Sequence, residues 1–224
     1  MKNMKAANLT EDDAIKFQVE NIRRFKPQVV VGHDEKGEYS HGQHILNTYF
    51  LEDAIFKAND ASYDESSYKK YGVWQISKLY LHLYEKNQIT MDYDTPLEYF
   101  NGKTAYEVSK EGYSKHLSQQ WTWFTKWING PNNSFKKATE IKTYSPLLYG
   151  LYYTNVGEDT LKNDMFENLK YYNEQEKEQE EKEAKLKEEE KKQEENNKKS
   201  EDKSYNKINI LQPMIIMVGL VIVY

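Results

Sequence analysis

The N-terminal part of the chain changes from a helical to an extended pattern of apolar residues. Residues 11–25 have apolar positions at helical spacing after a candidate N-cap at Thr10. The apolar residues on this face are Ile15, Val19, Ile22 and Phe25. The unalternated run VVVG at 29–32 follows and is typical of a strand buried on both faces, as in a parallel sheet. Helix followed by buried strand predicts an α/β fold.

Four later segments extend this pattern. Residues 41–58 have helical periodicity, and residues 76–85 alternate as a strand does. Residues 102–127 predict a long helix with Gly112 as its weak point, and residues 145–157 predict an extended segment. We therefore expect a partial Rossmann-like parallel sheet with flanking helices.

The composition changes sharply after about residue 172. Residues 173–207 are almost entirely Glu, Lys, Gln, Asn, Asp and Ser, and they lack the apolar heptad positions of a coiled coil. They are either a solvated single helix or a spacer with fluctuating helix, and we favour the spacer. Residues 1–172 form the expected globular domain.

Residues 208–224 are almost entirely apolar and carry no charged side chain. We interpret them as most of a transmembrane helix that is cut short, because a full span needs about 20 apolar residues. The alternative is a sticky but soluble tail. The first interpretation predicts a single-pass membrane protein, with the globular domain on the extracytoplasmic side.

Overall composition excludes some classes of function. The net charge of −5 argues against a nucleic-acid partner, which would favour a basic stripe. The absence of cysteine excludes disulfides, thiol catalysis and cysteine-based zinc sites. The first residues lack the apolar core of a signal peptide.

The first strand leads into a short loop that holds three of the five histidines, His33, His41 and His44. His41 and His44 are three residues apart at the start of a predicted helix, so both imidazoles lie on one face. Imidazole is the commonest metal ligand, but histidine pairs at this spacing are common without metal, and catalytic zinc usually has three protein ligands. The loop is therefore either part of a metal site or a histidine-rich polar turn.

Other side chains add to the chemistry of this loop. Asp34 and Glu38 offer carboxylates that would accept hydrogen bonds and fix an imidazole tautomer. Tyr39 provides a phenol in the same loop. The remaining histidines, His82 and His116, stand singly and carry no motif.

Three ordered segments resemble one enzyme family. The stretch KPQVVVGHDEKGEYSHGQH at 26–44 resembles the second motif of the PIG-L/LmbE-like deacetylases. KHLSQQW at 115–121 resembles the family's His-x-Ser-Gln segment, and GLYYTNVGEDTLKNDMFENL at 150–169 resembles its closing segment. The resemblance covers residues from about 11 to 170. It implies a zinc-dependent hydrolase that removes the acetyl group from an N-acetylglucosamine-containing glycoconjugate.

The resemblance also implies roles for individual residues. His44 matches the family's zinc-ligand histidine, and His41 matches the histidine that assists at the substrate carbonyl. Tyr39 matches a tyrosine held near the oxyanion. Asp34 and His116 are further candidates for binding substrate or supporting the ligands.

The family's first motif, of the Ala-His-Pro-Asp-Asp-Glu type, does not occur in these 224 residues. In the family it supplies two metal ligands and the general base. We therefore expect the chain alone to bind zinc poorly and to have little or no deacetylase activity. A separately encoded N-terminal half is the partner that would complete it.

The alternative is a non-catalytic, membrane-tethered, carbohydrate-binding remnant. Trp121, Trp123 and Trp127 would stack on sugars in that case, although core packing explains them more simply.

Overall fold

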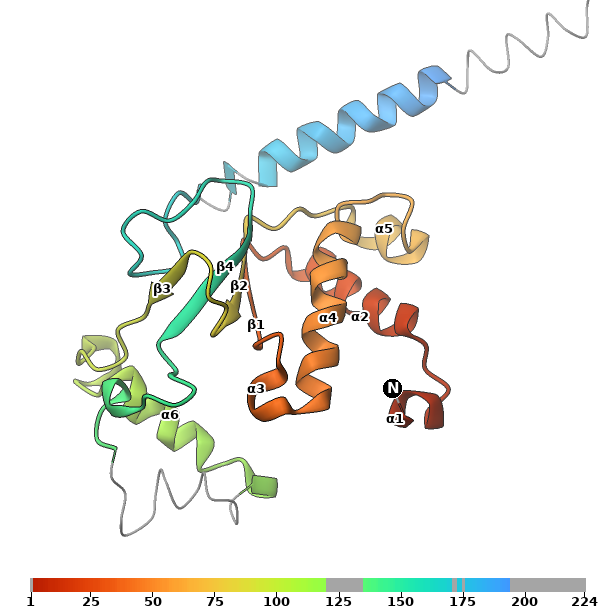
Figure 1. Cartoon of the computed structure of the whole chain (residues 1–224). Coiled ribbons are helices and arrows are strands. Elements are labelled where there is room, and N and C mark those ends of the chain that lie inside the picture. The colour runs from red at the N-terminus through yellow and green to blue at the C-terminus, as the bar shows by residue number, and fades with distance from the viewer. Residues whose placement is uncertain (1, 120–134, 171–172, 175, 194–224) are drawn as a thin grey trace, which may run out of the picture. The chain divides into compact units, whose positions relative to one another are not determined.

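A computed structural model of the chain describes residues 2–119, 135–170, 173–174 and 176–193 (Figure 1). The chain divides into two units at Lys170, and each is described by itself. In the second unit, residues 176–193 are helical. The apolar segment 208–224 lies outside the described residues. Among the helices that are described, none combines the length and apolar character needed to cross a membrane.

The first unit contains a four-stranded mixed sheet with the order β1-β2-β4-β3. The strands are β1 (Val29–Gly32), β2 (Lys78–His82), β3 (Gln88–Thr90) and β4 (Leu148–Thr154). β1 pairs with β2 in parallel, whereas β4 is antiparallel to both β2 and β3. The α/β class is confirmed, but the expectation of a parallel sheet is correct only for β1 and β2.

The antiparallel pairing of β4 with β2 and β3 is related to the position of α6 (Ala105–Tyr113), the helix described between β2 and β4. A parallel pair requires a crossover, usually a helix that packs on the sheet. α6 instead buries Tyr106 in a separate cluster with Ala138, Ile141 and Leu147. Among the described residues between β2 and β4, α6 is not packed on the sheet as such a crossover, and β4 pairs with both β2 and β3 in the antiparallel direction.

The remaining helices of this unit precede β2. They are α1 (Lys2–Ala6), α2 (Glu11–Phe25), α3 (Gly37–Ser40), α4 (Gly42–Lys57) and α5 (Glu65–Tyr71). Short 3-10 turns lie at Glu98–Phe100, Leu117–Gln119 and Ala138–Glu140. The predicted cap of α2 is confirmed, because Thr10 Oγ1 accepts from the Asp13 N–H at 3.1 Å while the Asp13 carboxylate accepts from the Thr10 N–H.

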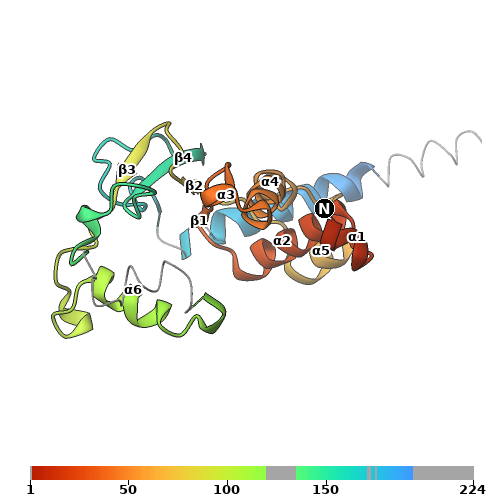
Figure 2. The same ribbon diagram turned by 60° about the horizontal axis from the view of Figure 1, so that its bottom comes forward.

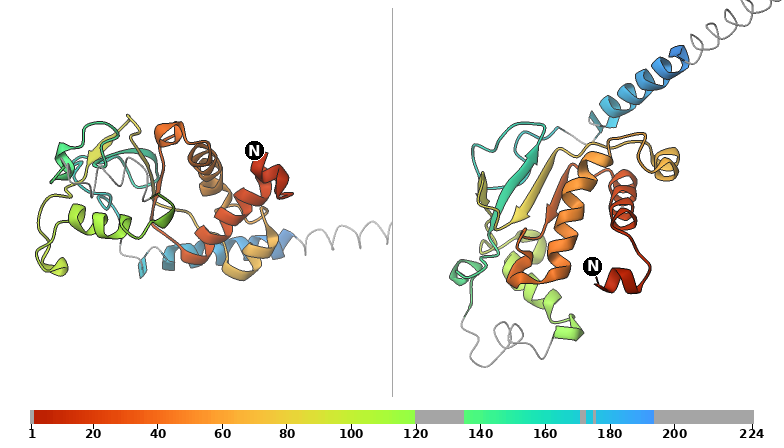
Figure 3. Two further views of the ribbon diagram at one scale, coloured as in Figure 1. Left: turned by 90° about the horizontal axis from the view of Figure 1, so that it is seen from below. Right: turned by 45° about the vertical axis from the view of Figure 1, so that its right-hand side comes forward.

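Helices α2 and α4 cover one face of the β1–β2 part of the sheet (Figures 1 and 3). Side chains from these elements and from residues 74–76 form the main core. Its fully or nearly fully buried members include Ile15, Val19, Ile22, Leu51, Ala54, Ile55, Trp74, Ile76, Leu79 and Leu81. Phe25, predicted on the same stripe, is 64% exposed because α2 ends there, beyond the edge of the core.

Two sequence expectations need correction. β1 is not buried on both faces, as the 48% exposure of Val31 shows. The reason is that β1 is the end strand of the described sheet. Of the long helix predicted over 102–127, residues 120–127 lie outside the described residues. In the described part, α6 ends at Tyr113, just after Gly112, a poor helix former. The tryptophans at 121, 123 and 127 lie outside the residues that the structure describes.

The opposite face of β2 carries a buried ion pair. Lys78 Nζ bonds the Asp159 carboxylate, and the Tyr80 hydroxyl donates to the same carboxylate at 2.6 Å. All three residues are buried. Because Lys78 and Tyr80 alternate with Leu79 and Leu81, β2 is covered by the helices on one face and by the segment around Asp159 on the other.

A second buried charge, Arg23, holds the connection between α4 and α5. Its guanidinium is fully buried and donates to backbone carbonyls and one hydroxyl. The acceptors are the carbonyls of Lys57, Ala58, Asp60, Tyr63 and Asp64 and the Ser67 hydroxyl, at 2.6–3.2 Å. The planar fork of arginine suits this set of acceptors, which a lysine with three donors cannot satisfy.

We predict that Arg23→Lys lowers the free energy of unfolding by about 2–4 kcal/mol, because each buried acceptor left without a donor costs about 1–3 kcal/mol. Urea unfolding followed by circular dichroism measures this. The matched control is Arg24→Lys on the exposed side of the same helix, where we expect a change within about 0.5 kcal/mol. Equal effects at the two positions would contradict this role for Arg23.

Candidate metal centre

The parallel pairing of β1 and β2 brings two histidines to one edge of the sheet. Gly32 is opposite Leu81 in the register, so His33, which follows β1, and His82, which ends β2, emerge side by side. Ligands of α/β sheets bind beyond the carboxyl ends of the strands, which is where these residues lie.

The loop after β1 turns tightly back toward this edge. Its turn residue, Gly37, has φ +76°, and a Cβ there would lie 2.4 Å from the Ile45 side chain. Only glycine fits this position. Glu38 follows with φ +43°, an uncommon conformation for a residue with a side chain. Buried Thr48 of α4 fixes the start of the loop by donating to the His33 carbonyl at 3.2 Å. α3 thus lies beside β1 and α4 (Figures 1 and 2).

Glu38 lies among three histidines. Its Oε1 is 2.7 Å from His82 Nδ1, and its Oε2 is 3.3 Å from His33 Nδ1 and 4.0 Å from His44 Nδ1. The rings of His33 and His44 are stacked, with centroids 4.1 Å apart and planes 5° apart. Ligand atoms of His33, Glu38 and His44 all lie within 4.8 Å of one another.

The surroundings of His82 favour the imidazolium form. Its Nδ1 faces the Glu38 carboxylate and its Nε2 faces the Ser145 carbonyl at 2.8 Å, so both nitrogens must donate. Burial by itself lowers the pKa of His82, but the bonds to Glu38 and Ser145 outweigh it and raise this pKa. For Glu38, burial opposes ionisation, yet the bonds and charges of His82 and His33 lower its pKa to about 2.

The pKa of His44 is shifted in the opposite direction from that of His82. Burial, followed by the charges of His33 and His41, lowers the pKa of His44. Its Nδ1 is buried and has no hydrogen-bond partner among the residues that the structure describes. A buried, neutral imidazole nitrogen without a partner is a ready metal ligand.

The other predicted site residues are distributed unevenly. His41 is exposed at the start of α4, with its ring 4.5 Å from that of His44. Asp34 accepts from the Lys36 N–H within its own loop rather than from an imidazole. His116 is exposed after α6 and bonds Ser118, not the cluster. Tyr39 belongs to α3, but its side chain lies outside what the structure describes.

Sequence reasoning missed the roles of His33 and His82. His82 carries no motif, and only the register of two strands separated by 45 residues places it beside the loop. A partial signal existed, because His33 directly follows the predicted strand at 29–32 and His82 lies in the second half of the predicted strand at 76–85. Glu38 was predicted to accept from an imidazole, and its partners are His82 and His33.

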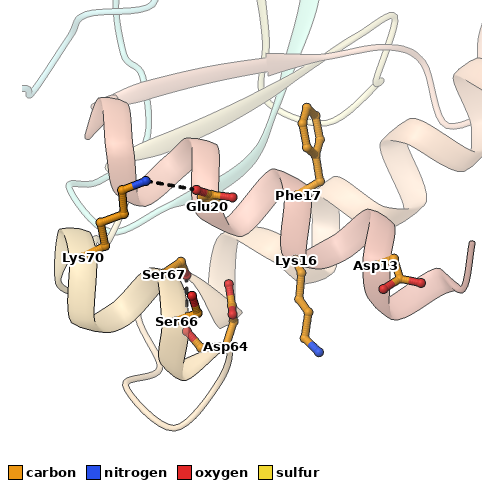
Figure 4. Close-up of a pocket in the computed structure, with 8 residues that line it drawn as sticks. All are labelled: Asp13, Lys16, Phe17, Glu20, Asp64, Ser66, Ser67 and Lys70. Atoms are coloured by element: carbon orange, nitrogen blue, oxygen red, sulfur yellow. Dashed lines mark hydrogen bonds and ion pairs between the residues drawn. The ribbon is translucent and has the colours of Figure 1, made fainter.

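A hollow of about 360 Å³ borders the cluster, lined by Gly32, His33, Glu38, Asn47, His82 and Tyr149 among others. Another hollow, of about 340 Å³, lies between α2 and α5 (Figure 4). There Lys70 is 4.0 Å from Glu20, and Ser67 is already engaged by Arg23. The charges of the carboxylates and lysines that line this second hollow offset one another. The hollow beside the histidine cluster is therefore the stronger candidate for a functional site.

Comparison with known proteins finds a similarity over part of the chain. The chain is 34% identical over 73 residues to a 1D-myo-inositol 2-acetamido-2-deoxy-alpha-D-glucopyranoside deacetylase of Geodermatophilus obscurus. The match covers 33% of this chain and 24% of that protein, so it spans about a quarter of the relative's length. No family model matches the chain. The similarity indicates a distant relationship to a hydrolase of the deacetylase type.

We predict a linked titration of Glu38 and His82 in the metal-free chain. The ionised Glu38 stabilises the fold above its ordinary pKa, and this contribution is lost as pH falls through about 2. The protonated His82 stabilises the fold below its ordinary pKa, and this contribution is lost as pH rises through its raised pKa. The pair therefore stabilises most between about pH 4.5 and 6.5.

Long-range ¹H–¹⁵N NMR of the imidazoles in the presence of a chelator tests this. We expect Glu38→Gln to lower the pKa of His82 and to weaken the pH dependence of the free energy of unfolding below about pH 4.5 and above about pH 6.5, where the pair's contribution is lost. An unchanged His82 titration in Glu38→Gln would show that the pair is not formed.

Proposed function

We propose that this chain carries one side of a zinc-dependent deacetylase site that removes acetyl from an N-acetylglucosamine conjugate. The observation that carries the proposal is the buried Nδ1 of His44, which has no partner in the described part of the chain and faces Glu38 Oε2. It lies in the loop that resembles the deacetylase motif. The distant match to a deacetylase of an acetamido sugar supports the same reaction class.

The residues present fit zinc chemistry. Zinc bound at His44 would activate water and polarise the acetamide carbonyl. His41 is exposed beside His44, where its imidazole can donate to the developing oxyanion or protonate the departing amine. The resemblance assigns Tyr39 to the same oxyanion. The adjoining hollow of about 360 Å³, with Tyr149 in its wall, suits a single sugar ring.

We propose a separately encoded N-terminal half as the partner that supplies the general base. The motif with that carboxylate does not occur in the 224 residues. β1 ends the strand order and has β2 as its only neighbour in the described sheet. A further strand paired in parallel with β1 would end beside His33, so a residue following it would enter the site.

We propose membrane attachment through residues 208–224, with the globular unit on the extracytoplasmic side. The support is the uncharged apolar sequence of this segment.

The test is hydrolysis of the acetamide of the inositol conjugate of N-acetylglucosamine, measured as released acetate and as the free amine formed on the sugar. The full chain is assayed alone and together with the product of any upstream reading frame that ends in a His-Pro-Asp-Asp motif. We expect little activity alone and zinc-dependent activity in the assembly, lost with a chelator and restored by zinc. Within the assembly, His41→Ala should lower kcat by ~10²–10³, as loss of one oxyanion donor does.

His116→Ala is the matched control, because this exposed histidine lies apart from the cluster, and we expect its activity to be unchanged. An assembly with zinc bound that releases no acetate from N-acetylglucosamine conjugates would overturn the proposed function.

A further inference from the structure

The loop resemblance implies one metal ligand in this chain, His44, but the structure places two more donors beside it. His33 Nδ1 and His44 Nδ1 both approach the same oxygen, Glu38 Oε2, at 3.3 and 4.0 Å. Donors bound tetrahedrally to zinc at about 2.0–2.1 Å lie about 3.4 Å from one another. The distances of both nitrogens from Glu38 Oε2 are near this value. Because the two rings are stacked, with planes 5° apart, one of them must turn about its Cβ–Cγ bond for both nitrogens to face a common ion.

The chemistry of the set is also that of a metal site. Two imidazoles and one carboxylate bind zinc and other first-row divalent ions. The three side chains do not satisfy one another's hydrogen bonds, because His44 Nδ1 is buried and has no hydrogen-bond partner within the described residues. A buried polar atom without a partner is costly, and an ion at this point would remove that cost.

The carboxylate is held in place before any ion binds. Glu38 Oε1 is taken by His82 at 2.7 Å, which leaves Oε2 toward His33 and His44. His82 is itself fixed by the Ser145 carbonyl, so the orientation of Glu38 is determined by β2 and the segment before β4. Ligating carboxylates usually have such a hydrogen-bonded support, and its loss typically costs 10–100-fold in metal affinity.

We propose that this chain alone binds one divalent transition-metal ion through His33, Glu38 and His44, with His82 as the positioning residue for Glu38. The inference rests on the proposed function for the role of His44. It departs from the resemblance in drawing the other two ligands from this chain, and it replaces the expectation of poor zinc binding.

The test is isothermal titration of tag-free, chelator-treated full chain with Zn²⁺. We expect one ion per chain, and at least a hundredfold loss of affinity in each of His33→Ala, Glu38→Gln and His44→Ala. The control His116→Ala should bind as the unchanged chain does. For His82, we expect His82→Ala to lose 10–100-fold in affinity.

Two further readouts keep the test independent of folding defects. In the unchanged chain, ¹⁵N NMR during zinc titration should shift Nδ1 of His33 and His44 rather than their Nε2. The visible d–d bands of bound Co²⁺ report on the ligand set, and His82→Ala should alter them. His82→Gln keeps a donor for Glu38 and should restore the bands in part.

The outcomes separate this inference from the proposed function. Zinc binding that needs His44 but not His33 or Glu38 overturns the inference and leaves the deacetylase proposal standing. No binding by the chain alone overturns it as well. Binding as expected, in an assembly that deacetylates nothing, supports the inference and defeats the proposed function.

Discussion

The site depends on the parallel pairing of β1 and β2. This pairing places His33 and His82, which are 49 positions apart in the sequence, at the same edge of the sheet. Glu38 then joins them with one carboxylate oxygen each, at 3.3 and 2.7 Å. A one-residue slip of β1 would turn its side chains to opposite faces and separate the two histidines. The register therefore determines whether a cluster exists at all.

The rest of the first unit keeps this register fixed. β2 is buried on both faces, by Leu79 and Leu81 toward the helices and by Lys78 and Tyr80 toward Asp159. A buried ion pair adds little net stability, but breaking it is costly, so it favours one arrangement over its alternatives. The constrained backbone at Glu38 is tolerated because His82 and His33 hold the side chain.

Local sequence patterns predicted several helices and strands of the first unit, whereas contacts between elements distant in the sequence could not be predicted from them. The capped helix at 11–25 and the strand at 78–82 follow from periodicity and cap residues. The direction of β4 did not follow, because it depends on α6 packing away from the sheet. The motif singled out His44, which the structure places beside His33 and Glu38, and its role as a metal ligand stays a prediction. His82 could not be singled out in this way, because its role comes only from the register and from Ser145, which approaches from a separate segment.

The loop after β1 and the end of β2 together form the proposed metal centre. Anomalous diffraction at the zinc edge, from crystals of the full chain grown with zinc, tests this most directly. We predict a single strong peak in the first unit, bounded by His33, Glu38 and His44, with His82 still bonded to Glu38. A peak held by His41 or His116 without Glu38, or no peak near the carboxyl ends of β1 and β2, would contradict it.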